Sequence, residues 1–145
     1  MNPTLKNILV TVCAVFIGSM ANMALVMAGG TIIPAPEGTD FTTMEGLSAG
    51  MHLMQPKHFL FPFLAHALGT LVAAFIVARF AASRQLQLAL ILSSLFFVGG
   101  LQMVIELPSP MWFNITDLSL AYYPMGFLGY KLGQRNNSIA VKFES

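Results

Sequence analysis

The apolar stretch at residues 58–75, HFLFPFLAHALGTLVAAF, carries His66 near its middle. Two acidic residues, Glu106 and Asp117, lie at the end of or within other long apolar runs of the chain. A charged group near the centre of a bilayer costs about 2.5–3.5 kcal/mol, so ionisable residues are rare there and usually bind protons, ions or polar ligands. We therefore take these three residues as the centre of a candidate site.

Three further polar side chains fall at a similar depth on the predicted helices: Asn22, Gln102 and Tyr122. At 100° per residue, His66 shares one helix face with the small residues Gly69 and Ala73. Helices in lipid pack through small residues, which predicts that His66 points into the bundle. The set could hold a polar ligand, pass protons or bind a cation. The alternative is structural, with His66 bonded to Asn22 or Gln102 and the two acids at hydrated helix ends.

Metal and haem sites are weaker alternatives. His58, His66 and Asp117 supply imidazole and carboxylate ligands for a metal ion, but no His-x-x-Glu-His or multi-histidine pattern accompanies them. A haem held by two histidines needs both at one depth on facing helices, and only His66 lies within a predicted span. No cofactor is therefore predicted.

Enzyme motifs are few. The single cysteine, Cys13, cannot form the thiol pairs that disulfide-generating membrane enzymes need. The sequence has no Ser-His-Asp pattern, and its two Gly-Gly pairs lack the strand-to-helix context of a nucleotide-binding loop. An enzyme is therefore the least favoured reading.

The composition is typical of an integral membrane protein. Of 145 residues, 56% are hydrophobic and 9% are charged, whereas soluble domains carry about 25% charged residues. The length suits one domain. A net charge of +1 gives no basic surface for nucleic acid.

Four apolar runs predict four membrane-spanning helices, at residues 8–28, 59–80, 86–105 and 113–133. Each has about the 20 residues that a helix needs to cross about 30 Å of hydrocarbon. The first run is longer than the core of a signal peptide, so we expect it to be retained. Asp117 and Pro124 interrupt the fourth run, and Pro124 predicts a kink. The predicted fold is all-α, a single four-helix transmembrane domain.

The basic residues predict the orientation of this domain. Six of the seven fall on one side of the predicted spans: Lys6, Arg79, Arg84, Lys131, Arg135 and Lys142. By the positive-inside rule, both termini are expected in the cytoplasm, with residues 134–145 as a cytoplasmic tail. The membrane is then expected to be the bacterial cytoplasmic (inner) membrane.

A long outer loop, residues 29–58, joins the first two predicted spans. Thr42 and Glu45 have the spacing of a capping box, and apolar residues follow at helical spacing. We therefore expect a short amphipathic helix at 43–54, lying on the outer surface as a connector or as a lid.

Small residues on the predicted helices mark their packing faces: Gly18, Gly69, Ala73, Gly126, Gly129 and Gly133. The expected partners are the lipid bilayer and other membrane subunits or further copies of the chain.

Three functional hypotheses follow from this architecture. The first is a small inner-membrane protein that acts as an accessory or partner-binding subunit of a membrane complex. The alternative is a component of a proton- or cation-coupled small-solute transporter or channel, with an outward-facing polar site. A membrane enzyme with a site in the outer leaflet is a second alternative.

Overall fold

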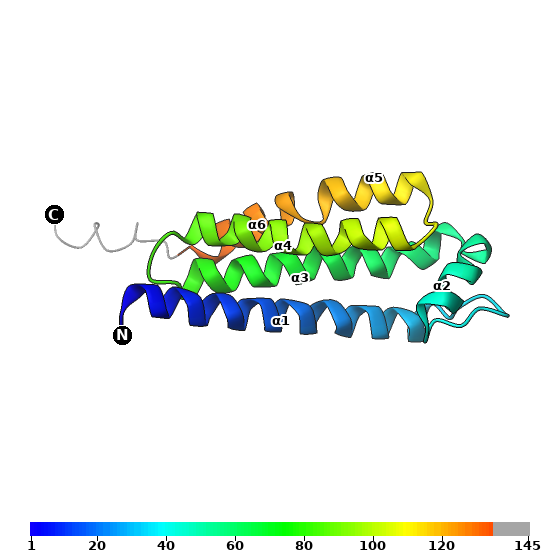
Figure 1. Cartoon of the computed structure of the whole chain (residues 1–145), viewed down its shortest axis with the longest axis horizontal. Helices are drawn as coiled ribbons and strands as arrows, with labels where there is room; N and C mark the ends of the chain where they lie inside the picture. Colours follow the sequence, from blue (N-terminus) through cyan, green and yellow to red (C-terminus); the bar gives the residue numbers. More distant parts are fainter. Residues whose placement is uncertain (135–145) are drawn as a thin grey trace.

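The protein is seen in a computed structural model that describes residues 1–134, and every regular element in that range is a helix (Figure 1). In chain order these are α1 (Pro3–Ile32), α2 (Met44–Gly50), η1 (Met51–Leu53), η2 (Pro56–Phe59), α3 (Leu60–Phe80), α4 (Gln85–Glu106), α5 (Met111–Leu120) and α6 (Tyr123–Gly133). Except for Gln134, the tail predicted at residues 134–145 lies outside the described residues.

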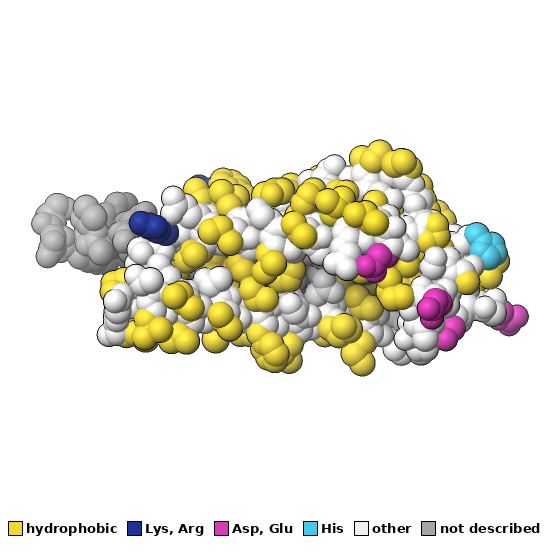
Figure 2. Space-filling model, viewed as in Figure 1, with side chains coloured by type: hydrophobic (Ala, Val, Ile, Leu, Met, Phe, Trp, Pro, Cys, Tyr) yellow, Lys and Arg dark blue, Asp and Glu magenta, His cyan; other side chains and the backbone are white. Residues whose placement is uncertain are grey.

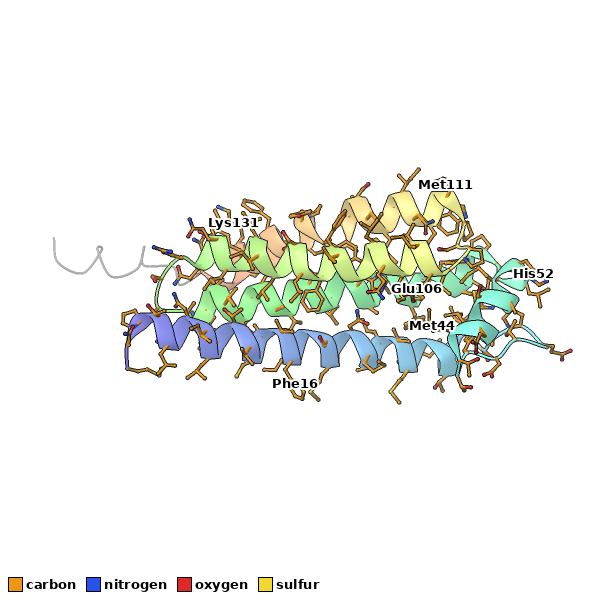
Figure 3. All side chains as sticks on the ribbon, in the orientation of Figure 1. Phe16, Met44, His52, Glu106, Met111 and Lys131 are labelled. Carbon is orange, nitrogen blue, oxygen red and sulfur yellow. The ribbon has the colours of Figure 1, made fainter. Side chains whose placement is uncertain are left out.

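Within residues 1–134, three helices are long and apolar enough to cross a membrane: Pro3–Ile32, Pro56–Phe80 and Gln85–Glu106. Their mean hydropathies are 2.1, 2.1 and 2.2. Large apolar side chains cover the outside of these helices. Phe16 is 67% exposed and points away from the bundle (Figure 3). Such a surface is stable in lipid, which confirms an all-helical protein of the membrane class.

The run predicted as one helix at 113–133 is instead two short helices, α5 and α6, arranged one after the other (Figure 1). Pro124 explains the break, because it has no N–H to donate to the carbonyl of Leu120. The backbone of Tyr122, at φ −111° and ψ −79°, leaves regular helical geometry there. The expectation of one kinked helix is therefore corrected to two helices, neither of which reaches the length of the other three.

α3 lies at the centre and packs against α1, α4 and α6. The backbones of α1 and α3 meet at a pair of glycines. A Cβ added to Gly18 would lie 2.7 Å from the carbonyl oxygen of Gly69 and 2.9 Å from Cβ of Ala73. Only a hydrogen side chain fits at Gly18 and Gly69, so these two glycines, together with the small Ala73, set how closely α1 approaches α3.

The glycines of α6 have the same role. Cβ atoms on Gly129 and Gly133 would overlap the carbonyl oxygens of Leu71 and Phe75 on α3. On the side facing α4, a Cβ on Gly126 would overlap the hydroxyl of Ser93. α6 therefore sits in the groove between α3 and α4 through its glycine face.

At the end of the bundle that holds the N-terminus, Asn7 ties α1 to the turn between α3 and α4. Its Oδ1 accepts hydrogen bonds from the backbone N–H groups of Ala82 (2.8 Å) and Ser83 (3.3 Å). Its Nδ2 donates to the carbonyl oxygen and to the hydroxyl of Ser83. This turn contains Arg84 in the left-handed region (φ 54°).

We expect Asn7→Ala to lower the free energy of unfolding by about 1 kcal/mol, because the turn loses its acceptor and its donor together. Thr4→Ala is the matched control, since Thr4 is also exposed near the start of α1 and its hydroxyl makes no hydrogen bond within residues 1–134. Thermal unfolding in detergent measures both. Equal stability of the two variants would contradict the role given to Asn7.

The opposite end of the bundle, called here the α2 end, is formed by the segment between α1 and α3 (Figure 1). The cap of α2 is Thr43, whose hydroxyl accepts from the N–H of Gly46 (3.0 Å). The sequence pattern placed this cap one residue earlier, at Thr42. Thr42 instead donates to the Asp40 carboxylate from its N–H and hydroxyl, which lowers the pKa of Asp40. Residues 44–53 are helical, as α2 and η1, where a helix at 43–54 was expected.

Apart from Lys57 in η2, the basic and acidic side chains of residues 1–134 separate between the two ends. Figure 2 shows the acidic and histidine side chains of one face toward the α2 end and the lysine or arginine side chains near the other end. His52 and Lys131 mark the two ends in Figure 3.

Candidate functional site

A histidine, an aspartate and a tyrosine form a hydrogen-bonded cluster between α3 and α5. Both carboxylate oxygens of Asp117 lie 2.9 Å from Nδ1 of His66. The Tyr122 hydroxyl donates to Asp117 Oδ2 at 3.0 Å. The rings of His66 and Tyr122 are stacked, with centroids 5.8 Å apart. We call this set the His66–Asp117–Tyr122 cluster.

The break between α5 and α6 is what lets Tyr122 reach Asp117. Residues five apart on one continuous helix differ by about 140° in direction, so their side chains would not meet. Asp117 lies in α5, and Tyr122 follows its end, where the backbone turns away from helical geometry. The cluster therefore depends on the interruption that Pro124 produces.

The cluster is largely removed from solvent. The Asp117 side chain is 3% exposed and that of His66 is 21% exposed, while Tyr122 is 1% exposed. A buried carboxylate needs hydrogen-bond donors, which His66 and Tyr122 supply. Gly100 of α4 makes room for the tyrosine, because a Cβ there would overlap the Tyr122 hydroxyl.

These bonds assign roles to the two ring nitrogens of His66. An ionised carboxylate only accepts hydrogen bonds, so Nδ1 carries the proton of the bond to Asp117. Nε2 makes no hydrogen bond within residues 1–134. A carboxylate on Nδ1 fixes the tautomer and the orientation of the ring. Nε2 is therefore the atom of the cluster that can meet a ligand.

His66 and Asp117 lie in the wall of a pocket at the α2 end with a volume of about 280 Å³. Six segments contribute to it: α1, the α1–α3 connection, α3, α4, the α4–α5 connection and α5. Most of the lining side chains are apolar: Val26, Ile33, Phe41, Leu47, Met51, Met54, Phe59, Phe61, Pro62, Met103, Val104, Leu107 and Phe113. An apolar cavity with a few convergent polar groups is the usual form of a small-molecule site.

Searches against protein-family models, curated proteins and solved structures find no match. The chemistry of this site therefore has to be argued from its own residues.

The structure brings His66, Asp117 and Tyr122 together but places the other predicted site residues elsewhere. Gln102 and Glu106 are exposed on α4 and bond each other, with Gln102 Nε2 donating to Glu106 Oε1 at 2.8 Å. Neither of these two residues lines the pocket. Asn22 lies on α1 beside Gly69 of α3, also outside the pocket wall.

His58 lines the same pocket as His66 and Asp117, but its Nδ1 accepts from the N–H of Gln55 at 2.9 Å. No three His, Cys, Asp or Glu side chains gather closely enough for a metal ion within residues 1–134. A haem held by two histidines would need a second histidine facing His66. Within residues 1–134, the hydrogen-bond partner of the His66 ring is instead the Asp117 carboxylate.

Sequence reasoning missed two features of the site. Gly100 is one of two adjacent glycines, and nothing in the pattern distinguishes it from Gly99. The aromatic wall was also missed: the ring of Phe59 packs on those of Trp112 and Phe113, with centroids 5.5 and 4.8 Å apart. The apolar aromatic residues around the loop 106–112 were the available signal.

Proposed function

We propose that this protein binds a small, mostly apolar molecule with one polar group in the pocket at the α2 end. His66 Nε2 would hold the polar group, and the apolar wall would enclose the rest. The observation that carries this proposal is the His66–Asp117–Tyr122 cluster in the wall of an apolar pocket. Ionisable groups buried in membrane-spanning helices are energetically unfavourable, rare and usually functional. The binding of a ligand would account for the presence of this cluster.

We further propose that the chain crosses the membrane four times, with α5 and α6 together forming the fourth crossing. The separation of basic and acidic side chains supports a cytoplasmic N-terminal end and an outward-facing α2 end, in a bacterial inner membrane. In this orientation the pocket opens in the outer half of the bilayer.

The test adds a bulky side chain to the pocket wall at a position where a Cβ overlaps no neighbouring atom. Gly30 lines the pocket, and a Cβ there would meet no atom within 4 Å. We expect Gly30→Leu to weaken the binding of 2-naphthol, a probe of suitable size, by roughly tenfold, or ~1.4 kcal/mol. Binding to the native protein and binding to the variant are each measured in lipid nanodiscs, with empty nanodiscs as the blank. The single tryptophan, Trp112, reports binding by its fluorescence, because it packs on Phe59 of the pocket wall.

Gly99→Leu is the matched control. Gly99 also has open space around its Cβ position, but it lies outside the pocket wall. Both substitutions replace glycine in a helix and so favour helix formation. Equal binding by the two variants, or no binding by the native protein, would contradict the proposed function.

Transport is a second candidate, supported by the interrupted crossing. Membrane transporters commonly place binding sites where a spanning helix is broken, and here the break adjoins the His66–Asp117–Tyr122 cluster. A transporter predicts a pH-dependent flux in proteoliposomes that His66→Leu and Asp117→Asn both abolish. An unchanged flux would contradict it.

The accessory-subunit hypothesis is supported by the Gln102–Glu106 pair, which is exposed on α4 near the exposed apolar side chains Val98 and Ile105. Polar side chains directed at lipid are costly, and a partner helix would cover them. Cross-linking from a cysteine at position 102 in native membranes tests this proposal. Products containing only lipid would count against it.

A further inference from the structure

We infer that the ligand of the pocket is a neutral phenol, one aromatic ring system with a hydroxyl group. This inference rests on the proposed function and adds the chemical class of the molecule. It follows from the charge of the pocket wall, from the hydrogen bonds already made there, and from the shape and chemistry of the apolar side chains.

The pocket wall disfavours an anion. No lysine or arginine is among the residues that line it. Phosphate and carboxylate groups are recognised in proteins chiefly by arginine and lysine. The carboxylate of Asp117 in the wall would also repel a second negative charge. A phospholipid head group or a fatty acid therefore does not fit.

A cation is disfavoured by the bonds of Asp117. Its two oxygens already accept from His66 Nδ1 and the Tyr122 hydroxyl, and its side chain is 3% exposed. These donors and the burial leave little access to the carboxylate, so an ammonium group would have to lose its hydration without forming a close ion pair, and burying an unpaired charge is unfavourable.

The remaining polar lining residues bond each other or nearby backbone. Ser109 donates from its hydroxyl to Asn114 Oδ1 at 2.9 Å, and Asn114 Nδ2 donates to the Ser109 carbonyl at 3.3 Å. His58 Nδ1 accepts from a backbone N–H. Nε2 of His58 and Nε2 of His66 make no hydrogen bond within residues 1–134, and of these two rings only that of His66 is held by the Asp117 carboxylate. His66 Nε2 is therefore the polar contact that we assign to the ligand.

A hydroxyl group suits that contact in either protonation state of the ring. Neutral His66 has an acceptor at Nε2 and protonated His66 has a donor there. A hydroxyl both donates and accepts, so it can bond each form. A ketone or ether can bond only the protonated form, and a hydrocarbon can bond neither.

The wall favours an aromatic body for the ligand. Four phenylalanines and three methionines line the pocket: Phe41, Phe59, Phe61, Phe113, Met51, Met54 and Met103. Aromatic pairs and sulfur–aromatic contacts each add favourable energy beyond burial. A cavity of about 150 Å³ holds benzene, and the volume here is about 280 Å³. A fused or substituted ring fits that space.

The experiment compares three probes of one size with the protein in lipid nanodiscs: 2-naphthol, 2-methoxynaphthalene and 2-naphthoate. We expect 2-naphthol to bind about threefold to tenfold more tightly than its methyl ether, the range given by one net hydrogen bond. 2-Naphthoate should bind most weakly, because the wall has no lysine or arginine for it and contains the Asp117 carboxylate. Equilibrium dialysis against protein-free nanodiscs corrects for partition into lipid.

His66→Leu assigns the preference to the imidazole. This variant should bind 2-naphthol and the ether equally, whereas Gln102→Leu, outside the pocket, should keep the native preference. Circular dichroism and gel filtration check that each variant is folded, and the native probe series decides the ligand class without any variant. Equal binding of the three probes, or tightest binding of 2-naphthoate, overturns the phenol assignment and leaves the pocket proposal intact. No binding of any probe overturns both.

Discussion

Asp117→Ala is expected to lower the free energy of unfolding by about 3 kcal/mol. The substitution leaves His66 Nδ1 and the Tyr122 hydroxyl without their shared acceptor in an almost closed part of the bundle. Removing one partner of a buried pair costs more than the pair itself contributes, because the remaining group stays buried. Reversible unfolding in mixed detergent micelles measures the change.

Glu106→Ala is the matched carboxylate control. Glu106 is exposed at the end of α4 and bonds only Gln102 among the described side chains, so the change should stay within about 0.5 kcal/mol. A double-mutant cycle of His66→Ala with Asp117→Ala should give a coupling energy of about 0.5–3 kcal/mol. A loss at Asp117 no greater than that at Glu106 would show that the cluster contributes nothing to stability.

Gly100→Ala is expected to destabilise the fold by about 2–3 kcal/mol, through overpacking and a displaced hydrogen bond. The new methyl group would overlap the hydroxyl of Tyr122, which is 1% exposed and packs edge-on against Phe97. The ring has little space to move, so its bond to Asp117 must lengthen or break. Detergent unfolding measures the loss of stability.

The neighbouring substitution, Gly99→Ala, should act in the opposite direction. A Cβ at Gly99 meets no atom within 4 Å, and alanine is favoured over glycine in a helix by about 1 kcal/mol. Two adjacent glycines should therefore respond with opposite signs. A similar effect at both positions would mean that helix propensity, and not the contact with Tyr122, controls the response.

The depth of each residue along its helix could be predicted from the sequence, because the helical rise is constant. His66, Asp117 and Tyr122 were expected at a similar depth, and the structure brings them together. Depth alone does not say which helices are neighbours. The neighbours are set by packing among the small residues of α1, α3 and α6. The sequence shows that each of these helices has a row of small residues, but not which rows meet.

The rotation of α4 about its own axis, which decides which of its faces packs against the bundle, was the main feature that could not be predicted. Gln102 and Glu106 share a face, but a helical periodicity does not say whether that face packs or is exposed. Here Ser93 and Gly100 face the partners of α4, so the two polar residues lie outside. The break in the fourth run was predicted only as a kink, although its cause at Pro124 was visible. The separation of α5 from α6 occurs at Ala121 and Tyr122, where the backbone of Tyr122 leaves helical geometry.

The two short helices bear on how the chain enters the bilayer during synthesis. α5 has 10 residues and α6 has 11, or about 15 and 17 Å of helix, against about 30 Å of hydrocarbon. Neither helix is long enough by itself to cross the hydrocarbon, whereas the helices Pro3–Ile32, Pro56–Phe80 and Gln85–Glu106 each are. We expect those three to enter first and to form the surface on which the last two assemble. The glycines of α6 are then a requirement of biogenesis as well as of the finished protein.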